Sequence, residues 1–467
     1  MINLKLKKEL KPEKIEKIDG TRDVLPVDQE LYDLFKRVAG QRARQSGFSK
    51  FSTPIIEKAE LFERGLGKST DVLTKNQLFT FEDRNGEKLA LRSELTLGMC
   101  RSYIENMLSQ EPQPLMFYSF DKVFRNVEGE NKIREFNQFG MEVFGEVDAG
   151  IDAQLIYLGM QILTDLKVAE GAKVLINSVG SHKTRKKFYR FATDYFEGKR
   201  KVLCSDCQEK IELTPWRIFD CQEEDCQIIC LKSPKIKDFW MGDDKKFHEE
   251  ILELLDVIDI SYEVDEKLTT SNDYYNRTIF KIVDAEGKTM LEGGRYDLLT
   301  THLGGEEIPA SGFSINAENV IDKMKKIGVK TPIKNKIDVF VGQLGKVAKI
   351  KVFPLIEKLQ ALGVRTMGGV GQPSIKGQMA MAEKSNAKFA LIMGTLEVRD
   401  NVVILRDMKK GVQEQIPFDD AIDIVIEKLG KENLDNNKFI DEIYIEEPKE
   451  ETDEEKFRKK RRSRFNG

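Results

Sequence analysis

The sequence predicts an α+β protein, in which an antiparallel-sheet core carries an insertion domain and is followed by a separate C-terminal α/β domain. Three observations lead to this prediction. The chain has 467 residues, which is more than one hydrophobic core usually holds. Short apolar segments with partial alternation run through its first part, as is typical of antiparallel strands. Strand and helix patterns then alternate in its last part, as in compact α/β domains.

The predicted core spans residues 19–325 and follows a charged lead-in at residues 1–18. A first helix is indicated after Pro26, where apolar side chains recur at helical spacing. Strands are predicted at Phe48–Thr53, Leu78–Phe81, Lys88–Leu91, Leu115–Phe120, Phe139–Phe144, Arg277–Val283 and Met290–Tyr296. Helical patterns are predicted at Ile151–Leu166 and Phe247–Val257. Residues 168–260 differ from the rest in composition, which favours an insertion domain.

The predicted core is followed by a linker at residues 326–336, which contains glycine, proline and several lysines. Strand and helix patterns alternate through residues 337–430 and predict the C-terminal α/β domain. Residues 431–467 run acidic and then basic without an apolar period. Such a segment is typical of a disordered tail.

The composition excludes some classes of protein. Hydrophobic residues make up 40% and charged residues 33%, as in a globular protein and not a disordered one. The net charge of −4 provides no global basic field, so nucleic acid would have to bind a local patch. No segment approaches the roughly 20 apolar residues of a membrane helix, and the charged first residues do not resemble a secretory signal. We therefore expect a cytoplasmic protein without a membrane partner.

Five of the six cysteines lie between Cys204 and Cys230. In a large cytoplasmic chain such clustering indicates metal ligands or free thiols before it indicates disulfides. A tetrahedral thiolate site for structural zinc is therefore one hypothesis, and reduced free thiols are the other. The candidate ligands are Cys204, Cys207, Cys221 and Cys226, with Cys230 as an alternative.

A series of motifs resembles the histidyl-tRNA synthetases, a class II aminoacyl-tRNA synthetase family. The motifs extend over about residues 18–430 and include DGTRDVLP, FSTPIIEKAELFERGLG, LRSELT, REFNQFGMEVFG, NDYYNRTIF, EGGRYD, ASGFSINAEN, IDVFVGQLG and QPSIKGQMAMAEKSNAKFALIMG. The resemblance implies a class II catalytic sheet, an insertion domain and a C-terminal anticodon-binding domain in a homodimer. It also implies histidine, ATP with magnesium, and transfer RNA as ligands.

The resemblance implies a nearly complete histidine pocket. The residues that match family positions contacting the α-amino group and imidazole of histidine are Glu94, Thr96, Gln138, Glu142, Tyr274 and Tyr275. Carboxylates suit an ammonium group, and amide and phenol groups suit an imidazole. Leu95 stands where the family has glycine, so we expect added bulk in this loop. Ser271 and Asn272 are expected to alter the edge of the pocket.

The positions that handle ATP depart from the family. Arg125 matches the second-motif arginine that contacts the α-phosphate, and it is the predicted catalytic residue. Thr270 and Asn319 stand where the family has arginines. Because arginines neutralise the charge that grows on phosphate during adenylation, the resemblance predicts impaired or lost adenylation. The alternative is that Lys132 or Arg295 supplies the missing charge.

Two further features bear on nucleotide and RNA binding. The loop after Arg125 is acidic and has Val127 where the family has a base-binding glutamate, so Glu128 is the candidate replacement. Candidate phosphate contacts in the C-terminal domain are Lys346, Lys349, Lys351, Lys376, Lys384 and Lys388. The basic run Arg458–Arg464 could add affinity for RNA, although such lysines and arginines can also be merely solvated charges.

We hypothesise a dimeric protein of this family that binds histidine and transfer RNA, with impaired or absent adenylation. One alternative is an ordinary histidine–tRNA ligase. Another is a histidine-sensing protein like the synthetase-like regulatory subunit of ATP phosphoribosyltransferase. The predicted anticodon-binding domain weighs against this last alternative.

Overall fold

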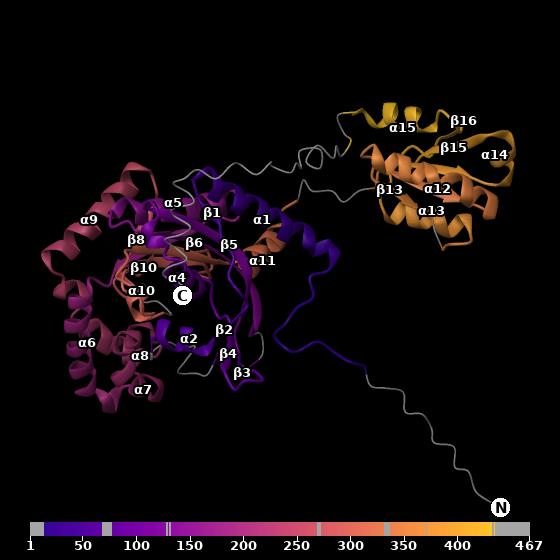
Figure 1. Ribbon diagram of the computed structural model, residues 1–467. Helices are drawn as coiled ribbons and strands as arrows, with labels where there is room; N and C mark the ends of the chain where they lie inside the picture. The colour runs from indigo at the N-terminus through magenta and orange to yellow at the C-terminus, as the bar shows by residue number, and fades with distance from the viewer. Residues whose placement is uncertain are drawn as a thin grey trace, which may run out of the picture. The chain divides into compact units, whose positions relative to one another are not determined.

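The computed structural model describes residues 14–67, 77–127, 129, 132–268, 272–330, 337–369, 371–431 and 434. Several predicted features therefore lie outside the described residues, namely Glu128, Thr270, Ser271, most of the lead-in and almost all of the charged tail with Arg458–Arg464. The chain divides into two compact units, Met1–Ile333 and Lys334–Gly467 (Figure 1). Within the described residues, no helix has both the length and the apolar character that a membrane span requires.

The first unit is built on an eight-stranded sheet with the order β1-β5-β6-β11-β10-β9-β7-β8. The outer pairs β1-β5 and β7-β8 are parallel, and the pairs between them are antiparallel. The strands are β1 (Ser49–Lys50), β5 (Leu115–Phe124), β6 (Glu135–Phe144), β7 (Lys173–Ser178), β8 (Tyr262–Val264), β9 (Asn276–Val283), β10 (Thr289–Arg295) and β11 (Ala310–Asn316). The predicted α+β core with an antiparallel sheet is confirmed.

One face of this sheet is covered by helices. They are α1 (Pro26–Gln45), α5 (Ala149–Asp165), α9 (Gly242–Val257) and α11 (Ala317–Ile327). Alternate residues of β6, Phe139, Met141 and Val143, belong to the same buried cluster as the apolar residues of these helices. Because successive strand residues point to opposite faces, Gln138 and Glu142 of β6 point away from the helices.

The opposite face carries a second buried cluster and the smaller elements. The helices here are α2 (Ala59–Gly65), α4 (Thr96–Glu105) and α10 (Leu299–His302), and the antiparallel sheet β2-β4-β3 consists of Ile56–Lys58, Lys88–Leu91 and Thr80–Glu82. Tyr274, Tyr275 and Tyr296 belong to this cluster. The candidate histidine-binding residues are thus on the face that the long helices leave uncovered.

The predicted insertion domain at residues 168–260 includes elements that pack with the main sheet. β7 pairs with β9 inside the main sheet, and apolar side chains of α9 share one buried cluster with those of α5. The separately packed part runs from α6 to η4 and has its own buried cluster. Its elements are α6 (His182–Glu197), η2 (Arg200–Val202), α7 (Ser205–Leu213), η3 (Pro215–Asp220), α8 (Glu224–Lys232) and η4 (Ile236–Phe239). Figure 1 shows α6, α7 and α8 grouped together.

The second unit is a five-stranded sheet with the order β13-β12-β14-β15-β16. β12 is parallel to both β13 and β14, whereas β15 and β16 continue the sheet in antiparallel fashion. Its elements are β12 (Val339–Gln343), α12 (Lys346–Ala361), β13 (Thr366–Gly368), α13 (Ile375–Lys384), β14 (Phe389–Met393), α14 (Thr395–Asp400), β15 (Val402–Asp407), β16 (Gln413–Pro417) and α15 (Ala421–Leu429). The predicted α/β alternation is confirmed.

Candidate functional site

The predicted histidine-binding residues line one cavity on the uncovered face of the large sheet. Its walls come from the start of α4, the end of β5, and strands β6, β10 and β11. The lining residues are Glu94, Thr96, Arg125, Gln138, Glu142, Asn272, Tyr274, Tyr275, Glu292, Tyr296, Gly312, Phe313 and Ser314. The fold therefore brings together Arg125 and all six residues that the sequence assigns to histidine, although they lie up to 181 residues apart in the chain.

Glu142 is a buried acidic group of this cavity and is 2% exposed. Thr96 donates a hydrogen bond to its Oε1 over 2.6 Å, and the hydroxyl of Tyr296 donates to its Oε2. Burial raises the pKa of the Glu142 carboxyl to about 8, because these two hydrogen bonds only partly replace the lost water. Glu142 thus favours a proton or a cationic ligand near neutral pH.

Glu94 is a second buried carboxyl, placed just before α4 and 3% exposed. Asn272 donates to its Oε2 over 2.9 Å, and the Tyr274 hydroxyl lies 3.3 Å from its Oε1. Burial raises the pKa of the Glu94 carboxyl to about 7, whereas the positive charge of Arg125 and these hydrogen bonds lower it. Both carboxyls of this cavity therefore have pKa values near neutral pH.

Further polar groups line the same cavity. The backbone N–H of Leu95 donates to Oε1 of Gln138 over 2.9 Å, which fixes the amide at the cavity wall. Burial raises the pKa of Tyr274 and of Tyr275 well above the ordinary value, so both phenols stay neutral donors. Buried carboxylates without a cation are costly, and a ligand with an ammonium group would relieve that cost.

The side chain of Leu95, which stands where a glycine was expected, is buried in the second cluster and is not among the residues that line the cavity. Asn272 lies at the cavity, where its amide bridges Glu94 and the Tyr274 hydroxyl at 2.9 Å and 2.8 Å. Tyr296 and Glu292 also line the cavity and were not predicted. The motif EGGRYD contains both, but its pattern does not indicate which side chains face the cavity.

Gly312 has no side chain, and the carboxylate of Glu142 occupies the space that a Cβ at this position would fill. A Cβ at this position would lie 1.7 Å from Oε2 of Glu142 and 2.6 Å from the backbone oxygen of Met141. We expect Gly312→Ala to weaken histidine affinity at least about tenfold, because the carboxylate must leave its position. Calorimetric titration measures this. Gly242→Ala is the matched control, since a Cβ there meets no atom within 4 Å, and equal affinities for the two variants would contradict the prediction.

Comparison with protein families identifies the chain. A family model described as histidyl-tRNA synthetase matches residues 20–183 and 241–320. The chain belongs to the histidyl-tRNA synthetase family. A second model, described as an anticodon binding domain, matches residues 338–428 of this family member. The unmatched residues 184–240 correspond to the separately packed segment with its own buried cluster.

Relatives and solved structures agree with this family. The chain is 33% identical over 418 residues to the histidine–tRNA ligase of Geobacillus sp. (strain WCH70), covering 88% of this chain and 98% of that one. It is 34% identical over 406 residues to that of Thermoanaerobacter sp. (strain X514), covering 86% and 96%. The apo S. aureus histidyl-tRNA synthetase superposes with a TM-score of 0.74 at 28% identity, covering 88% and 100%. A Bacillus halodurans C protein titled ATP phosphoribosyltransferase regulatory subunit/histidyl-tRNA synthetase shares the fold, with a TM-score of 0.59, 19% identity and coverage of 82% and 99%.

Arg125 and Asn319, the two described positions that the sequence analysis links to ATP, lie in different surroundings. Arg125 follows β5 and lines the cavity beside Glu94, as its effect on the Glu94 pKa indicates. Asn319 lies in the first turn of α11, where its side-chain amide donates to the backbone oxygen of Thr289 over 3.0 Å. It is not part of the cavity wall. Of the two positions at which the sequence predicts a replaced arginine, the structure describes Asn319, and Thr270 lies outside the described residues.

Arg295 cannot supply the missing charge from its observed position. It is 1% exposed and forms an ion pair with Asp152 at 2.9 Å. Its guanidinium also donates to the backbone oxygens of Glu146 and Asp148 at 2.8 Å and 3.1 Å. Breaking a buried, fully bonded ion pair would cost several kcal/mol. The alternative in which Arg295 moves to the phosphates would require this ion pair with Asp152 to break.

Lys132 occupies a different, open hollow. This hollow is lined by Arg22, Lys132, Arg134, Lys288, Asp322 and neighbouring residues of the loops before α1 and β6. Arg22 pairs with Asp322 at 3.2 Å, and Arg134 donates to Asn126 over 2.7 Å. Lys132 is exposed, so a reorientation of its side chain would break no buried bond.

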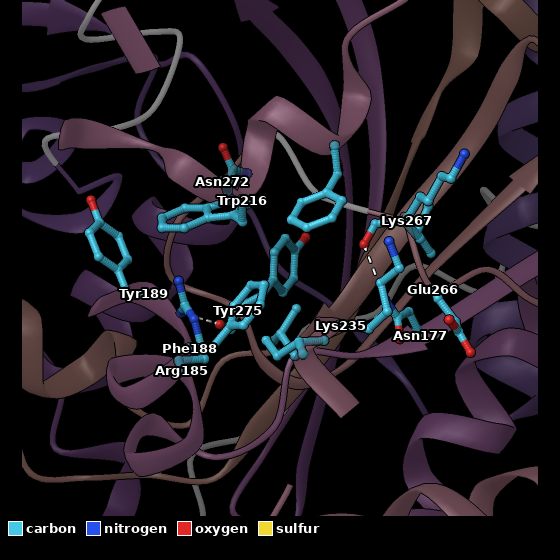
Figure 2. Close-up of a pocket in the computed structure, with 14 residues that line it drawn as sticks. Asn177, Arg185, Phe188, Tyr189, Trp216, Lys235, Glu266, Lys267, Asn272 and Tyr275 are labelled. Atoms are coloured by element: carbon cyan, nitrogen blue, oxygen red, sulfur yellow. Dashed lines mark hydrogen bonds between the residues drawn. The ribbon is translucent and has the colours of Figure 1, made fainter. Parts of the chain in front are cut away.

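A second, mainly apolar cavity adjoins the cavity that Glu94 and Glu142 line. Asn272 and Tyr275 line both. Its other walls come largely from the insertion, where Figure 2 shows Tyr189, Trp216 and Arg185 close to these two residues. Arg185 of α6 pairs with Asp273 at 2.6 Å and donates to the backbone oxygen of Tyr275. The insertion thus touches the segment that carries two histidine-pocket tyrosines.

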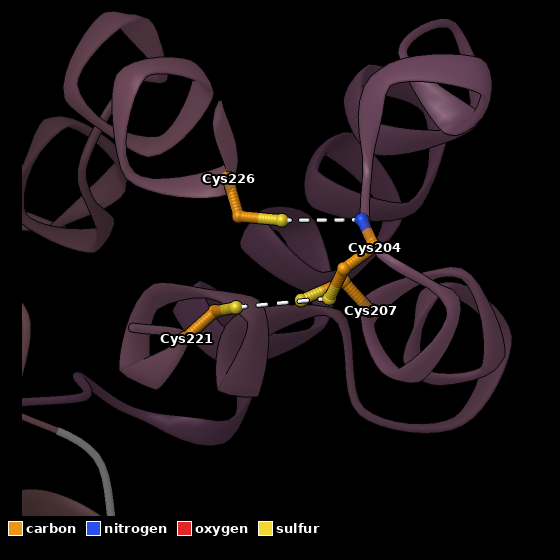
Figure 3. Close-up of side chains that lie close together, drawn as sticks. All are labelled: Cys204, Cys207, Cys221 and Cys226. Carbon is orange, nitrogen blue, oxygen red and sulfur yellow. Dashed lines mark hydrogen bonds between the residues drawn. The ribbon is translucent and has the colours of Figure 1, made fainter. Parts of the chain in front are cut away.

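Four of the predicted metal ligands come together in the insertion. The Sγ atoms of Cys204, Cys207, Cys221 and Cys226 all lie within 4.8 Å of one another (Figure 3). The alternative ligand, Cys230, lies apart from this cysteine quartet. It is buried in the insertion's apolar cluster, and its thiol donates to the backbone oxygen of Ile218 over 3.4 Å.

The candidate RNA-contacting lysines of the anticodon-binding domain are not equivalent. Lys388 pairs with the buried Asp338 at 2.9 Å, and Lys351 donates to Asn401 over 2.7 Å. These contacts give both lysines a structural role. Five lysines of the set are exposed, namely Lys346 and Lys349 on α12, Lys376 and Lys384 on α13, and Lys388, whereas Lys351 is half-buried.

Proposed function

We propose that this histidyl-tRNA synthetase family protein binds free histidine in the cavity between Glu94 and Glu142. The observation that carries the proposal is the pair of buried carboxyls whose pKa values are raised to about 7 and about 8. A ligand with an ammonium group offsets the cost of ionising them. The Gln138 amide and the tyrosine hydroxyls provide neutral hydrogen-bonding groups for an imidazole.

We propose further that adenylation of histidine is impaired. Two family arginines are replaced, by Thr270 and Asn319, and Arg125 remains as the cavity's phosphate-binding cation. Removing one donor that stabilises a transition state typically costs about 100- to 1,000-fold in rate. The alternative cation Arg295 is held by Asp152 in a buried ion pair, which supports impairment over relocation.

The test is adenylate formation from histidine and ATP with magnesium, measured on the purified full chain. We expect a rate at least about 100-fold below that of a family member with both arginines. Calorimetric titration of histidine on the same preparation is the control for a folded pocket. Equal rates would contradict impairment and make the chain an ordinary histidine–tRNA ligase, with Lys132 of the open hollow as the first candidate for the relocated charge.

Transfer RNA is the proposed macromolecular partner. The anticodon-binding domain and the exposed lysines of α12 and α13 support this proposal, because such lysines suit phosphate contacts. The same domain argues against a purely histidine-sensing regulatory subunit, which would not need to read RNA. If the chain binds histidine but not transfer RNA, the regulatory alternative gains support.

Three finer points belong to the same proposal. A homodimer is supported by the family and by Ile55 and Ile56, which are 46% and 49% exposed and offer apolar surface to a second copy. Cytoplasmic action is supported by six cysteines that are all free thiols. Zinc is not indicated by the family comparison, and we propose it on the geometry of the cysteine quartet alone.

A further inference from the structure

We infer that the cysteine quartet binds one structural zinc ion, and that this site positions the edge of the histidine pocket through Arg185. The quartet lies outside the histidine cavity and has no part in the chemistry of adenylation. Cys204 and Cys207 flank the start of α7, Cys221 follows η3, and Cys226 lies in the first turn of α8. The ligands therefore tie together three short elements of the insertion.

The sulfur geometry fits zinc. A tetrahedral zinc with Zn–S bonds of about 2.3 Å separates its sulfurs by about 3.8 Å. The Sγ atoms of Cys204 and Cys221 are 3.8 Å apart, and all four sulfurs fall within 4.8 Å. A disulfide needs about 2.05 Å, and none is formed. The four sulfurs thus surround a space of the right size for one ion.

The surroundings of the sulfurs also resemble a metal site. The backbone N–H of Cys204 points at Sγ of Cys226 over 3.3 Å, and such donors stabilise the negative charge of bound thiolates. Four thiolates would close the coordination sphere, which indicates a structural ion and not a catalytic one. The insertion is a small unit of short helices, and small units commonly need a metal or a disulfide to hold them.

Two side chains, Trp216 and Arg185, connect the cysteine quartet to the histidine pocket. η3 lies between Cys207 and Cys221 in the sequence and carries Trp216. The guanidinium of Arg185 lies 5.5 Å from the centre of the Trp216 ring. Arg185 in turn donates to the backbone oxygen of Asp273 over 2.9 Å and pairs with its carboxylate at 2.6 Å. The segment Asp273–Tyr275 is thereby fixed by an insertion residue. Figure 2 shows the bond between Arg185 and Tyr275.

This second step rests on the proposed function, since its readout is histidine affinity. Arg185 is a positioning residue here, because it holds the backbone oxygens of Asp273 and Tyr275, on either side of Tyr274, and does not line the histidine cavity. Without the metal, α7, η3 and α8 lose their common anchor. Trp216 and Arg185 then lose their fixed support, and we expect histidine affinity to fall about tenfold.

The first experiment measures metal content of the full chain purified without chelators. We expect about one zinc per chain, and a cobalt-substituted form with the thiolate-to-metal absorption of tetrahedral sulfur coordination. Cys207→Ser should lose the metal, and Cys230→Ser should retain it, because Cys230 is buried in the same cluster but lies outside the quartet. If Cys207→Ser does not fold, the cobalt spectrum of the natural chain still decides. No binding of zinc or cobalt, or iron in place of zinc, overturns the assignment.

The second experiment compares histidine affinity of the zinc-loaded chain, the chelator-treated chain and Arg185→Lys. Zinc removal and Arg185→Lys should each weaken histidine binding, and zinc should restore it in the first case. If the chain holds zinc but its removal leaves histidine affinity unchanged, the positioning step is wrong and the zinc site stands. If the zinc-loaded chain binds no histidine at all, the proposed function fails instead.

Discussion

Thr270→Arg combined with Asn319→Arg is expected to raise the rate of adenylate formation about 100-fold or more over the natural chain. Arg125 lines the cavity that we propose for histidine, so under the proposed function the missing element is positive charge at the phosphates. Either single substitution should raise the rate of adenylate formation much less, because the effects of groups that act on one transition state are not additive. Single-turnover measurement of adenylate formation gives the rates directly.

An arginine in place of Asn319 gives up the bond to the backbone oxygen of Thr289 but keeps the helix cap. Its backbone N–H is bonded to the side chain of Asn316 at 3.2 Å, and a substitution leaves this cap in place. Glu318, the residue before it, is held by the backbone and side chain of Asn137 at 2.8 Å and 2.9 Å. A positive charge near a helix N-terminus costs about 0.3–1 kcal/mol, which a folded chain tolerates.

Glutamine at both positions is the matched control, because it adds length and hydrogen-bond donors without charge. We expect no gain from Thr270→Gln with Asn319→Gln. If the double arginine variant stays as slow as the natural chain while histidine binding is intact, then these two replacements do not explain the impairment. The acidic loop after Arg125 would be the next cause to test.

The sequence predicts those parts of the fold that depend on local pattern. β4 and β9 are indicated by apolar alternation and are observed within one residue of the prediction. β11 is not predicted, because Ser311, Gly312 and Ser314 weaken the strand pattern around Phe313 and Ile315. β7 is not separated from the insertion, because pairing with β9 joins residues about 100 positions apart. Such long-range pairing leaves no mark in local composition.

The same limit applies to the site. Gln138 and Glu142 lie four residues apart on one strand, so a shared face follows from alternation alone. The hydroxyl of Tyr296 that reaches Glu142 comes from 154 positions away. Arg295 is a candidate free cation in the sequence, yet Asp152, 143 positions away, neutralises it. Family motifs place such residues in one site, but they do not give the partners that decide each side chain's role.

Histidine affinity is expected to fall about 100-fold as the pH is lowered from about 8.5 to about 6.5. In the free protein burial raises the pKa of Glu142 to about 8 and that of Glu94 to about 7. Above these values both carboxyls are ionised and ready for an ammonium group. Below them each must lose a proton before it can pair with the ligand, so binding releases protons and weakens with falling pH. Calorimetry in buffers of different ionisation enthalpy measures both the affinity and the protons released.

Glu142→Gln separates the two carboxyls in this prediction. The variant resembles the natural chain with Glu142 protonated, so its affinity near pH 8.5 should already be low, and its remaining pH dependence should follow Glu94. Stability changes in the opposite sense in the free protein. Because the folded-state pKa values lie above the unfolded ones, stability is lost as the pH rises from about 4.5 toward 8, and histidine should restore more of it at high pH. A flat affinity profile for the natural chain would mean that Glu142 and Glu94 do not pair with the ligand, and the histidine assignment would have to rest on other groups.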